Sequence, residues 1–337
     1  MKAAIMFEAH KPLEIVEVEM RKPKAREVLI RTGAAGLCHS DLHFIEGLYP
    51  HPLPVVLGHE SAGVVEAVGD EVTYVQKGDH VITCLSVFCG TCENCVQGRT
   101  QICLNTSVKE PPGQADKYVW DRPEKINTFA NLSSYAEQML VHENAVVKMR
   151  KDMPMPQAAL IGCGGVGMAA MNGAVIAGAS RIIAVDTNPV KLQLAAKLGA
   201  TDLVNPNDGD PVEQIKNLTN GGVHHAIECL GTKRTSEQAF EMLGIGGTAT
   251  IVGMVPFGQK LEIHGADFLR ERKIQGSSMG SNQFRVDMPN LVELYMSGKL
   301  QLDDWVSDLI EIEQINEGFK AMKEGKVVRS IIDFKVV

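Results

Sequence analysis

"AALIGCGGVGMAAMNGAVIAGASRIIAVD", residues 158–186, combines a glycine-rich turn, a helix of small residues and a short apolar strand. Gly162, Gly164 and Gly167 fit the pattern G-x-G-x-x-G, a turn that lets the backbone approach a pyrophosphate at the start of a helix. The strand "RIIAVD" then ends at Asp186, near the position expected for an acidic residue that binds ribose hydroxyls. Together these features predict a Rossmann unit that binds a dinucleotide.

The identity of Asp186 favours NAD as that dinucleotide. Its carboxylate would repel the additional phosphate of NADP, and the residues "TNPVK" that follow offer no arginine to accept one. A structural alternative is that Asp186 only caps the helix that begins near Pro189.

The rest of the chain divides into two patterns around this stretch. From Gln157 onward, apolar runs such as "HHAIECLG" and "GTATIVG" alternate with helical runs such as "PVKLQLAAKLGA". Six such strands with intervening helices predict a doubly wound parallel sheet in an α/β protein. Before Gln157, short runs such as "EVLIRTGAAG" predict a mostly β domain. We therefore expect a β domain over residues 1–157, completed by residues 287–337, and a Rossmann domain over residues 158–286.

Length and charge restrict the class of protein. A chain of 337 residues suits two domains, and its net charge of −8 argues against nucleic acid or an anionic membrane as a partner. No signal peptide or apolar span is evident, so a cytoplasmic location is expected. Eight cysteines in a reducing compartment are read first as metal ligands or catalytic groups.

Four of these cysteines lie close together in the polar segment "CGTCENCVQGRTQIC". Thiolates at this spacing can surround one tetrahedral zinc ion and form a closed structural site, with the ligands Cys89, Cys92, Cys95 and Cys103. Free thiols and an iron–sulfur cluster are the alternatives. A structural zinc is the strongest inference from spacing alone, and such a site leaves no open position for catalysis.

A second, looser group of metal-binding residues lies in "GLCHSDLH" and "GHE". A catalytic zinc takes about three protein ligands and keeps one position open, and Cys38 with His59 would supply two of them. From residue type alone this assignment is weak, because lone histidines more often have a structural role.

The phrase "GHESAGVVEAVGDEV" fits G-H-E-x2-G-x5-G-x2-V through Gly63, Gly69 and Val72. With the cysteine cluster and the later glycine fingerprint, it resembles the zinc-dependent medium-chain alcohol dehydrogenases over nearly the whole chain. The resemblance implies a GroES-like catalytic domain, a Rossmann domain, and NAD-dependent oxidation of a primary alcohol to an aldehyde. It also implies a small-molecule alcohol or aldehyde as partner and a homo-oligomer, since the family forms dimers and tetramers.

By the same resemblance, Cys38 and His59 ligate the catalytic zinc and Glu60 lies beneath it as an alternative ligand. Asp41 would orient His59, which meets the need for a carboxylate on the second nitrogen of a metal-binding histidine.

The remaining implied roles concern proton transfer and the cofactor. Ser40 would accept the proton of the alcohol, and His43 would relay it through the cofactor ribose. His39 would face the cofactor pyrophosphate, and Arg329 matches the phosphate contact near the C-terminus.

One departure from the family lies in "AALIGCG". The family has its third zinc ligand in such a phrase, followed by a helix and the first Rossmann strand, and only then the glycine turn. Here one phrase stands for both, so about thirty residues, roughly one supersecondary unit, are missing. Either residues 158–162 form a shortened first strand and Cys163 lies in the pyrophosphate turn, or Cys163 remains a zinc ligand. We favour the first, because omitting a central strand leaves backbone groups unpaired.

If Cys163 lies in the pyrophosphate turn, the catalytic zinc lacks its third protein ligand. Glu60 or a water could replace Cys163, since carboxylate oxygens also bind zinc. The alternative function is therefore a scaffold that binds zinc and NAD but has impaired or no turnover.

Overall fold

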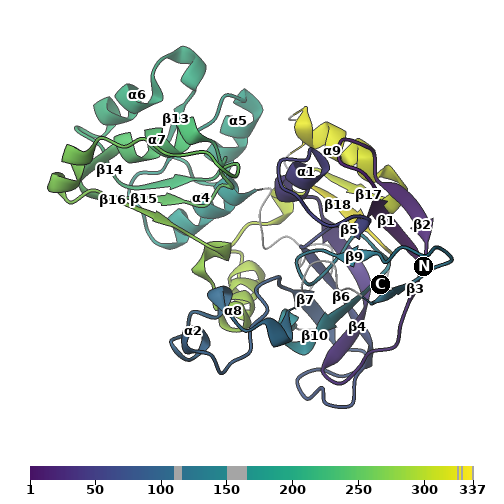
Figure 1. Ribbon diagram of the computed structural model, residues 1–337. Helices are drawn as coiled ribbons and strands as arrows, with labels where there is room; N and C mark the ends of the chain where they lie inside the picture. Colours follow the sequence, from purple (N-terminus) through teal and green to yellow (C-terminus); the bar gives the residue numbers. More distant parts are fainter. Residues whose placement is uncertain (110–115, 150–164, 325, 328, 336–337) are drawn as a thin grey trace. The chain divides into compact units, whose positions relative to one another are not determined.

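The computed structural model describes residues 1–109, 116–149, 165–324, 326–327 and 329–335, which form two compact units (Figure 1). The first unit comprises residues 1–164, 281–298 and 302–337, and the second comprises residues 165–280 and 299–301. No helix in the described parts of the chain is both long enough and apolar enough to cross a membrane.

The first unit is built on two sheets, one of seven strands and one of four, as far as the described residues go. The larger sheet has the order β11-β7-β6-β4-β18-β17, with β10 also paired to β4. Its strands are β4 (Glu27–Gly36), β6 (Ser61–Val68), β7 (His80–Thr83), β10 (Gln138–His142), β11 (Val146–Lys148), β17 (Asp308–Ile310) and β18 (Ser330–Asp333). The smaller sheet has the order β2-β1-β5-β9 and consists of β1 (Lys2–Met6), β2 (Glu14–Glu17), β5 (Val55–Val56) and β9 (Asn127–Thr128).

The C-terminal strand completes the first unit. Ile331, Ile332 and Asp333 of β18 pair antiparallel with residues 34–36 at the end of β4. Helix α9 (Ile315–Lys323) packs on β18, and its buried face joins the core around β1, β5 and α1 (His39–Ile45). This pairing fixes the end of β4, from which the chain enters α1.

Two further helices and a minor ribbon belong to the first unit. They are α2 (Glu93–Val96), α8 (Phe284–Met296), and the paired strands β3 (Glu19–Met20) and β8 (Tyr118–Val119). Arg285 attaches α8: its guanidinium lies 3.9 Å from the ring centre of Tyr74, and Nη2 donates to the Glu143 carbonyl at 2.8 Å. A cation over an aromatic face is attractive, so this contact explains why α8 belongs to the first unit.

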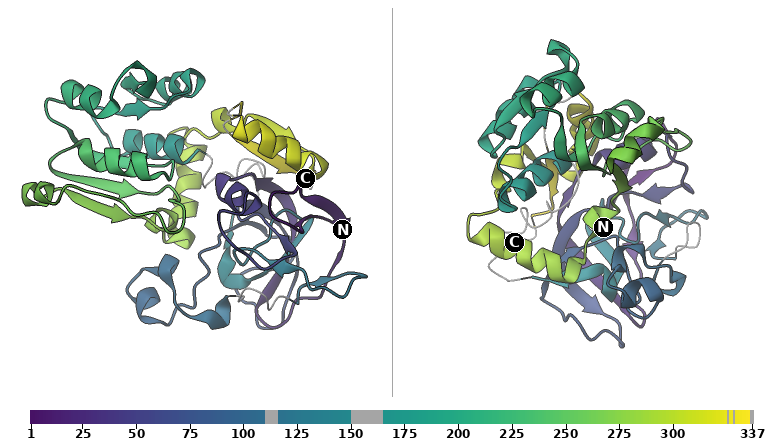
Figure 2. Two further views of the ribbon diagram at one scale, coloured as in Figure 1. Left: turned by 45° about the horizontal axis from the view of Figure 1, so that its top comes forward. Right: turned by 90° about the vertical axis from the view of Figure 1, so that its left-hand side faces the viewer.

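The second unit consists of alternating helices and parallel strands. These are α4 (Val166–Ile176), β12 (Ile183–Val185), α5 (Pro189–Lys197), β13 (Asp202–Val204), α6 (Pro211–Leu218), β14 (Val223–Glu228), α7 (Lys233–Glu241), β15 (Leu243–Ile251) and β16 (Lys273–Gly276). Side-chain caps start three of these helices, because Asn188, Asp210 and Thr232 each accept a hydrogen bond from a first-turn N–H. Helix α7 packs against β14 and β15, and its residues Ala239 and Phe240 belong to the buried core of this unit. Figure 2 shows the helices and strands of the unit from two further sides.

The described strands of the second unit pair in two groups. Strand β12 pairs in parallel with β13, while β14, β15 and β16 form a separate parallel sheet. Within the described residues, no strand pairs with the second edge of β12 or of β14. The α/β class is confirmed, and five of the six predicted strands lie within the described residues as β12 to β16. The expected shortened first strand, residues 158–162, lies outside the described residues.

Candidate active site and zinc centres

The residue that caps the start of helix α1 is a cysteine that also belongs to a metal-binding group. Cys38 has an extended backbone (φ −119°, ψ 145°), and its sulfur accepts a hydrogen bond from the Ser40 N–H at 3.4 Å. The sulfur thus fills the position in which serine or aspartate usually caps a helix. Because α1 follows the end of β4, this cap places the buried Cys38 sulfur beside the loop that precedes β6.

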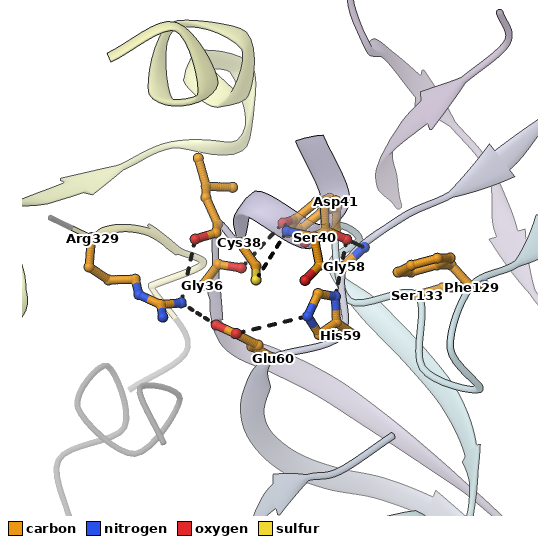
Figure 3. A network of polar contacts seen from close by, with 12 residues as sticks. Gly36, Cys38, Ser40, Asp41, Gly58, His59, Glu60, Phe129, Ser133 and Arg329 are labelled. Carbon is orange, nitrogen blue, oxygen red and sulfur yellow. Dashed lines mark hydrogen bonds and ion pairs between the residues drawn. The ribbon is translucent and has the colours of Figure 1, made fainter. Parts of the chain in front are cut away.

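That loop brings His59 and Glu60 to Cys38 (Figure 3). One ligand atom of each residue lies within 4.8 Å of the other two, and all three residues are buried. Sulfur, imidazole nitrogen and carboxylate oxygen are the three ligand types that zinc accepts, so this donor set fits the ion. Cys163, the other candidate ligand, lies outside the described residues.

Asp41 controls the orientation of His59. The carboxylate Oδ1 lies 3.2 Å from His59 Nδ1, which leaves Nε2 on the side of Cys38 and Glu60. Burial acts to lower the pKa of His59, but the negative charges of Asp41 and Cys38 outweigh it and raise that pKa well above its ordinary value. The same two negative groups that attract a proton here would stabilise a bound cation.

Glu60 lies between His59 and a buried arginine. Its Oε1 is 3.9 Å from His59 Nε2, and its Oε2 forms an ion pair with Nη1 of Arg329. Burial raises the pKa of Glu60 to about 8, although the charge of Arg329 opposes the rise. Gly36 makes room for this pair, since a Cβ there would lie 2.8 Å from Glu60 Oε2. The guanidinium of Arg329 thus contacts Glu60, and its proposed contact with a cofactor phosphate stays a prediction.

The proposed proton-relay residues share helix α1. Ser40 and His43 are three positions apart, so they lie on the same side of the helix, and both are half-buried. The ring of His43 stacks on Tyr49 with centroids 6.1 Å apart, and its Nδ1 is buried without a hydrogen-bond partner among the described residues. His39, at the first position of α1, is exposed.

Phe129 and Tyr135 are residues that sequence reasoning did not assign. The ring of Phe129 meets His59 edge-on, with centroids 5.8 Å apart, and also contacts Phe44 at 4.7 Å. Tyr135 donates its hydroxyl hydrogen to Asp41. No sequence motif predicts these contacts, because Phe129 and Tyr135 lie far along the chain from Asp41 and His59. The fold of the first unit brings them together.

The four clustered cysteines have the geometry of a tetrahedral zinc site. Their sulfurs are 3.9 Å apart for Cys89 and Cys95, 3.5 Å for Cys92 and Cys95, and 3.8 Å for Cys92 and Cys103. Zinc–sulfur bonds of about 2.3 Å place the corners of a tetrahedron about 3.8 Å apart. Hydrogen bonds from Thr91 hold the pKa of Cys89 at about 5, which favours the thiolate that binds metal. The residues therefore fit a zinc ion.

The cofactor residues are partly described. Gly162 and Gly164 lie outside the described residues, while Gly167 is the second residue of α4. Asp186 follows β12 and accepts from the Asn188 N–H at 2.8 Å, and Asn188 is the residue that caps α5. Asn188, and not Asp186, therefore caps helix α5.

Comparisons with known proteins agree with these observations. Residues 24–151 match the alcohol dehydrogenase GroES-like domain, and residues 165–297 match the zinc-binding dehydrogenase domain. An S-(hydroxymethyl)glutathione dehydrogenase of Photobacterium damsela subsp. piscicida is 35% identical, with 99% of each chain covered. The chain belongs to the zinc-dependent medium-chain alcohol dehydrogenases. This family uses NAD and zinc, so its members' chemistry supports the dehydrogenase and not the scaffold without turnover.

Two further relatives show the same extent of similarity. Alcohol dehydrogenase 1 of Pisum sativum is 34% identical, covering 98% of this chain and 96% of its own. The crystal structure of benzyl alcohol dehydrogenase from Acinetobacter calcoaceticus gives a TM-score of 0.91 at 32% identity, with 98% of each chain covered. The alignment with the Photobacterium enzyme spans 368 residues, so at least 31 of its positions have no counterpart in this dehydrogenase of 337 residues. That excess is similar in length to the predicted shortening, whose place before the glycine turn stays a prediction.

Proposed function

We propose that this dehydrogenase oxidises a primary alcohol to the matching aldehyde at the site formed by Cys38, His59 and Glu60. The observation that carries the proposal is the convergence of these three buried groups beside α1, with Asp41 behind His59. When bound, zinc supplies a Lewis acid that polarises the alcohol oxygen, and NAD supplies the acceptor of the hydride.

The side chains around this site bind the metal, transfer the proton and contact the substrate. Cys38 and His59 hold the ion, and Asp41 keeps His59 Nε2 directed toward it. The Ser40 hydroxyl accepts the proton of the alcohol as it gives up its own, and His43, on the same side of α1, takes the released proton toward solvent. Phe129 forms an apolar wall against His59, which suits the carbon chain or ring of an alcohol.

The test combines metal content with turnover. Protein purified without added metal is analysed for zinc per chain, and NADH formation is followed by absorbance with a series of primary alcohols. We expect about two zinc ions per chain and alcohol-dependent NADH. About one zinc, with NAD bound but no NADH formed, would support the scaffold and contradict the proposal.

We also propose that Asp186 selects NAD over NADP. Asp186→Asn keeps an acceptor for the Asn188 N–H but removes the charge that would repel the phosphate of NADP. The ratio of kcat/KM for NAD to that for NADP should fall at least about tenfold, equivalent to about 1.4 kcal/mol. Steady-state kinetics with both cofactors measure this. Asp208→Asn, an exposed position in the same unit, is the matched control. An unchanged ratio in Asp186→Asn would remove Asp186 from cofactor selection.

Assembly and location complete the proposal. We propose a homo-oligomer, because the second unit exposes large apolar side chains at Ile245, Phe257 and Leu269. We propose the cytoplasm as its location, because none of the seven described cysteines forms a disulfide, which suits a reducing compartment. Sedimentation analysis measures the oligomeric state, and a monomer would contradict the first of these statements.

A further inference from the structure

Tyr135 is a fully buried residue that reaches the metal-binding group from a distant part of the chain. Its hydroxyl donates to Asp41 Oδ2 at 2.7 Å and also lies 3.3 Å from the carbonyl oxygen of Gly36. Tyr135 and Asp41 are 94 positions apart in sequence. A phenol hydroxyl that donates to a buried carboxylate forms a short, charge-assisted bond, which is stronger than a bond between neutral groups.

The other oxygen of Asp41 is already engaged. Oδ1 accepts from the Gly58 N–H at 3.0 Å and lies 3.2 Å from His59 Nδ1. Among the described residues, Tyr135 is therefore the only donor to Oδ2, and Asp41 is completely shielded from solvent. With both oxygens held, the plane of the carboxylate is fixed, and so is the direction in which His59 points.

The ring of Tyr135 has little freedom to move. Its backbone N–H donates to the Leu57 carbonyl at 3.1 Å, and its own carbonyl accepts from the Ala4 N–H at 2.8 Å. The ring lies so close to Gly58 that a Cβ on that glycine would be 2.7 Å from its Cδ1. The ring of Phe319 in α9 meets the Tyr135 ring edge-on, with centroids 6.0 Å apart. A hydroxyl on a ring held in this way is a fixed donor.

We propose that Tyr135 is a positioning residue of the zinc site, acting on the metal through Asp41 and His59. The inference rests on the proposed function, in which Cys38 and His59 hold the ion. A fixed carboxylate sets both the tautomer and the ring orientation of a metal-binding histidine, and loss of such a partner typically weakens metal binding about 10- to 100-fold. The opposing interpretation is that the hydroxyl merely fills the core and satisfies its own hydrogen bond.

The test is the variant Tyr135→Phe, which removes the hydroxyl and keeps the ring. Zinc retained per chain is measured against increasing chelator, and the four-cysteine site serves as an internal reference in the same molecule. We expect the zinc of the Cys38 and His59 site to be released at about 10- to 100-fold lower chelator strength, with the four-cysteine zinc unchanged. In the cobalt-substituted protein, the visible bands of the weaker site should shift as well.

Tyr295→Phe is the matched control, because the Tyr295 hydroxyl also donates to a carboxylate, Asp303 Oδ1 at 3.0 Å, outside the site. It should release both zinc ions as the unmodified protein does. Release of both ions in parallel in Tyr135→Phe, with a lower melting temperature, would show a structural role only and overturn the inference. Unchanged release would overturn it too. If the unmodified chain held only the four-cysteine zinc, the proposed function itself would fail.

Discussion

Replacing His59 by asparagine should lower kcat/KM for alcohol oxidation roughly a thousandfold, which corresponds to about 4 kcal/mol of transition-state stabilisation. The substitution removes the Nε2 that faces Cys38 and Glu60, while the amide can still bond to Asp41 Oδ1. Because the carboxylate keeps a partner, the fold should survive. Zinc content should fall from about two ions per chain to about one. Steady-state kinetics and elemental analysis of the same preparation measure both effects.

His10→Asn is the matched control for this substitution. His10 is exposed and has a positive φ of 65°, a backbone conformation that asparagine adopts more readily than most residues. The control should keep both zinc ions and full activity. Retention of both zinc ions by His59→Asn would mean that His59 is not a ligand, and the proposed site would have to be abandoned.

Replacing Cys103 by serine should release the zinc of the four-cysteine site. The Cys103 sulfur is buried, lies 3.8 Å from that of Cys92, and accepts from the Cys89 N–H at 3.4 Å. Losing a direct ligand costs more than the roughly 10- to 100-fold that loss of an outer partner costs. Structural zinc binding contributes on the order of 10 kcal/mol to the folding of small metal-binding modules. Residues 89–103 should therefore become sensitive to protease, because all four ligands lie in this segment and would lose the ion that joins them.

The comparison for this prediction is Cys229→Ser. Cys229 belongs to neither described metal-binding group, and burial raises the pKa of its thiol to about 12, so it is protonated. That variant should retain its zinc and resist protease as the unmodified chain does. Equal zinc content in Cys103→Ser and Cys229→Ser would contradict the closed four-cysteine site.

The second unit shows how much of the fold can be predicted from local sequence patterns. Strand–helix alternation predicted the elements from α4 to β16, since each depends on periodicity within about ten residues. Asn188, not Asp186, caps α5, a difference of two positions that turn chemistry decides. Strand pairing, in which β12 pairs with β13 and β15 lies between β14 and β16, is a feature that single-strand patterns do not specify.

The sequence by itself determined the features whose parts are close in the chain. The four cysteines span residues 89–103, and their spacing alone predicted a structural zinc site. Cys38, Ser40 and His43 are also close in the chain, but their roles followed from the family resemblance and not from spacing. Only the tertiary structure decided which distant groups surround them. Tyr135 meets Asp41 across 94 positions, and Arg329 meets Glu60 across 269. Such contacts exist because β18 closes on β4 and the segment after β9 returns beside β1. Closing long loops costs conformational entropy, which the burial of the whole β unit offsets and which no short motif encodes.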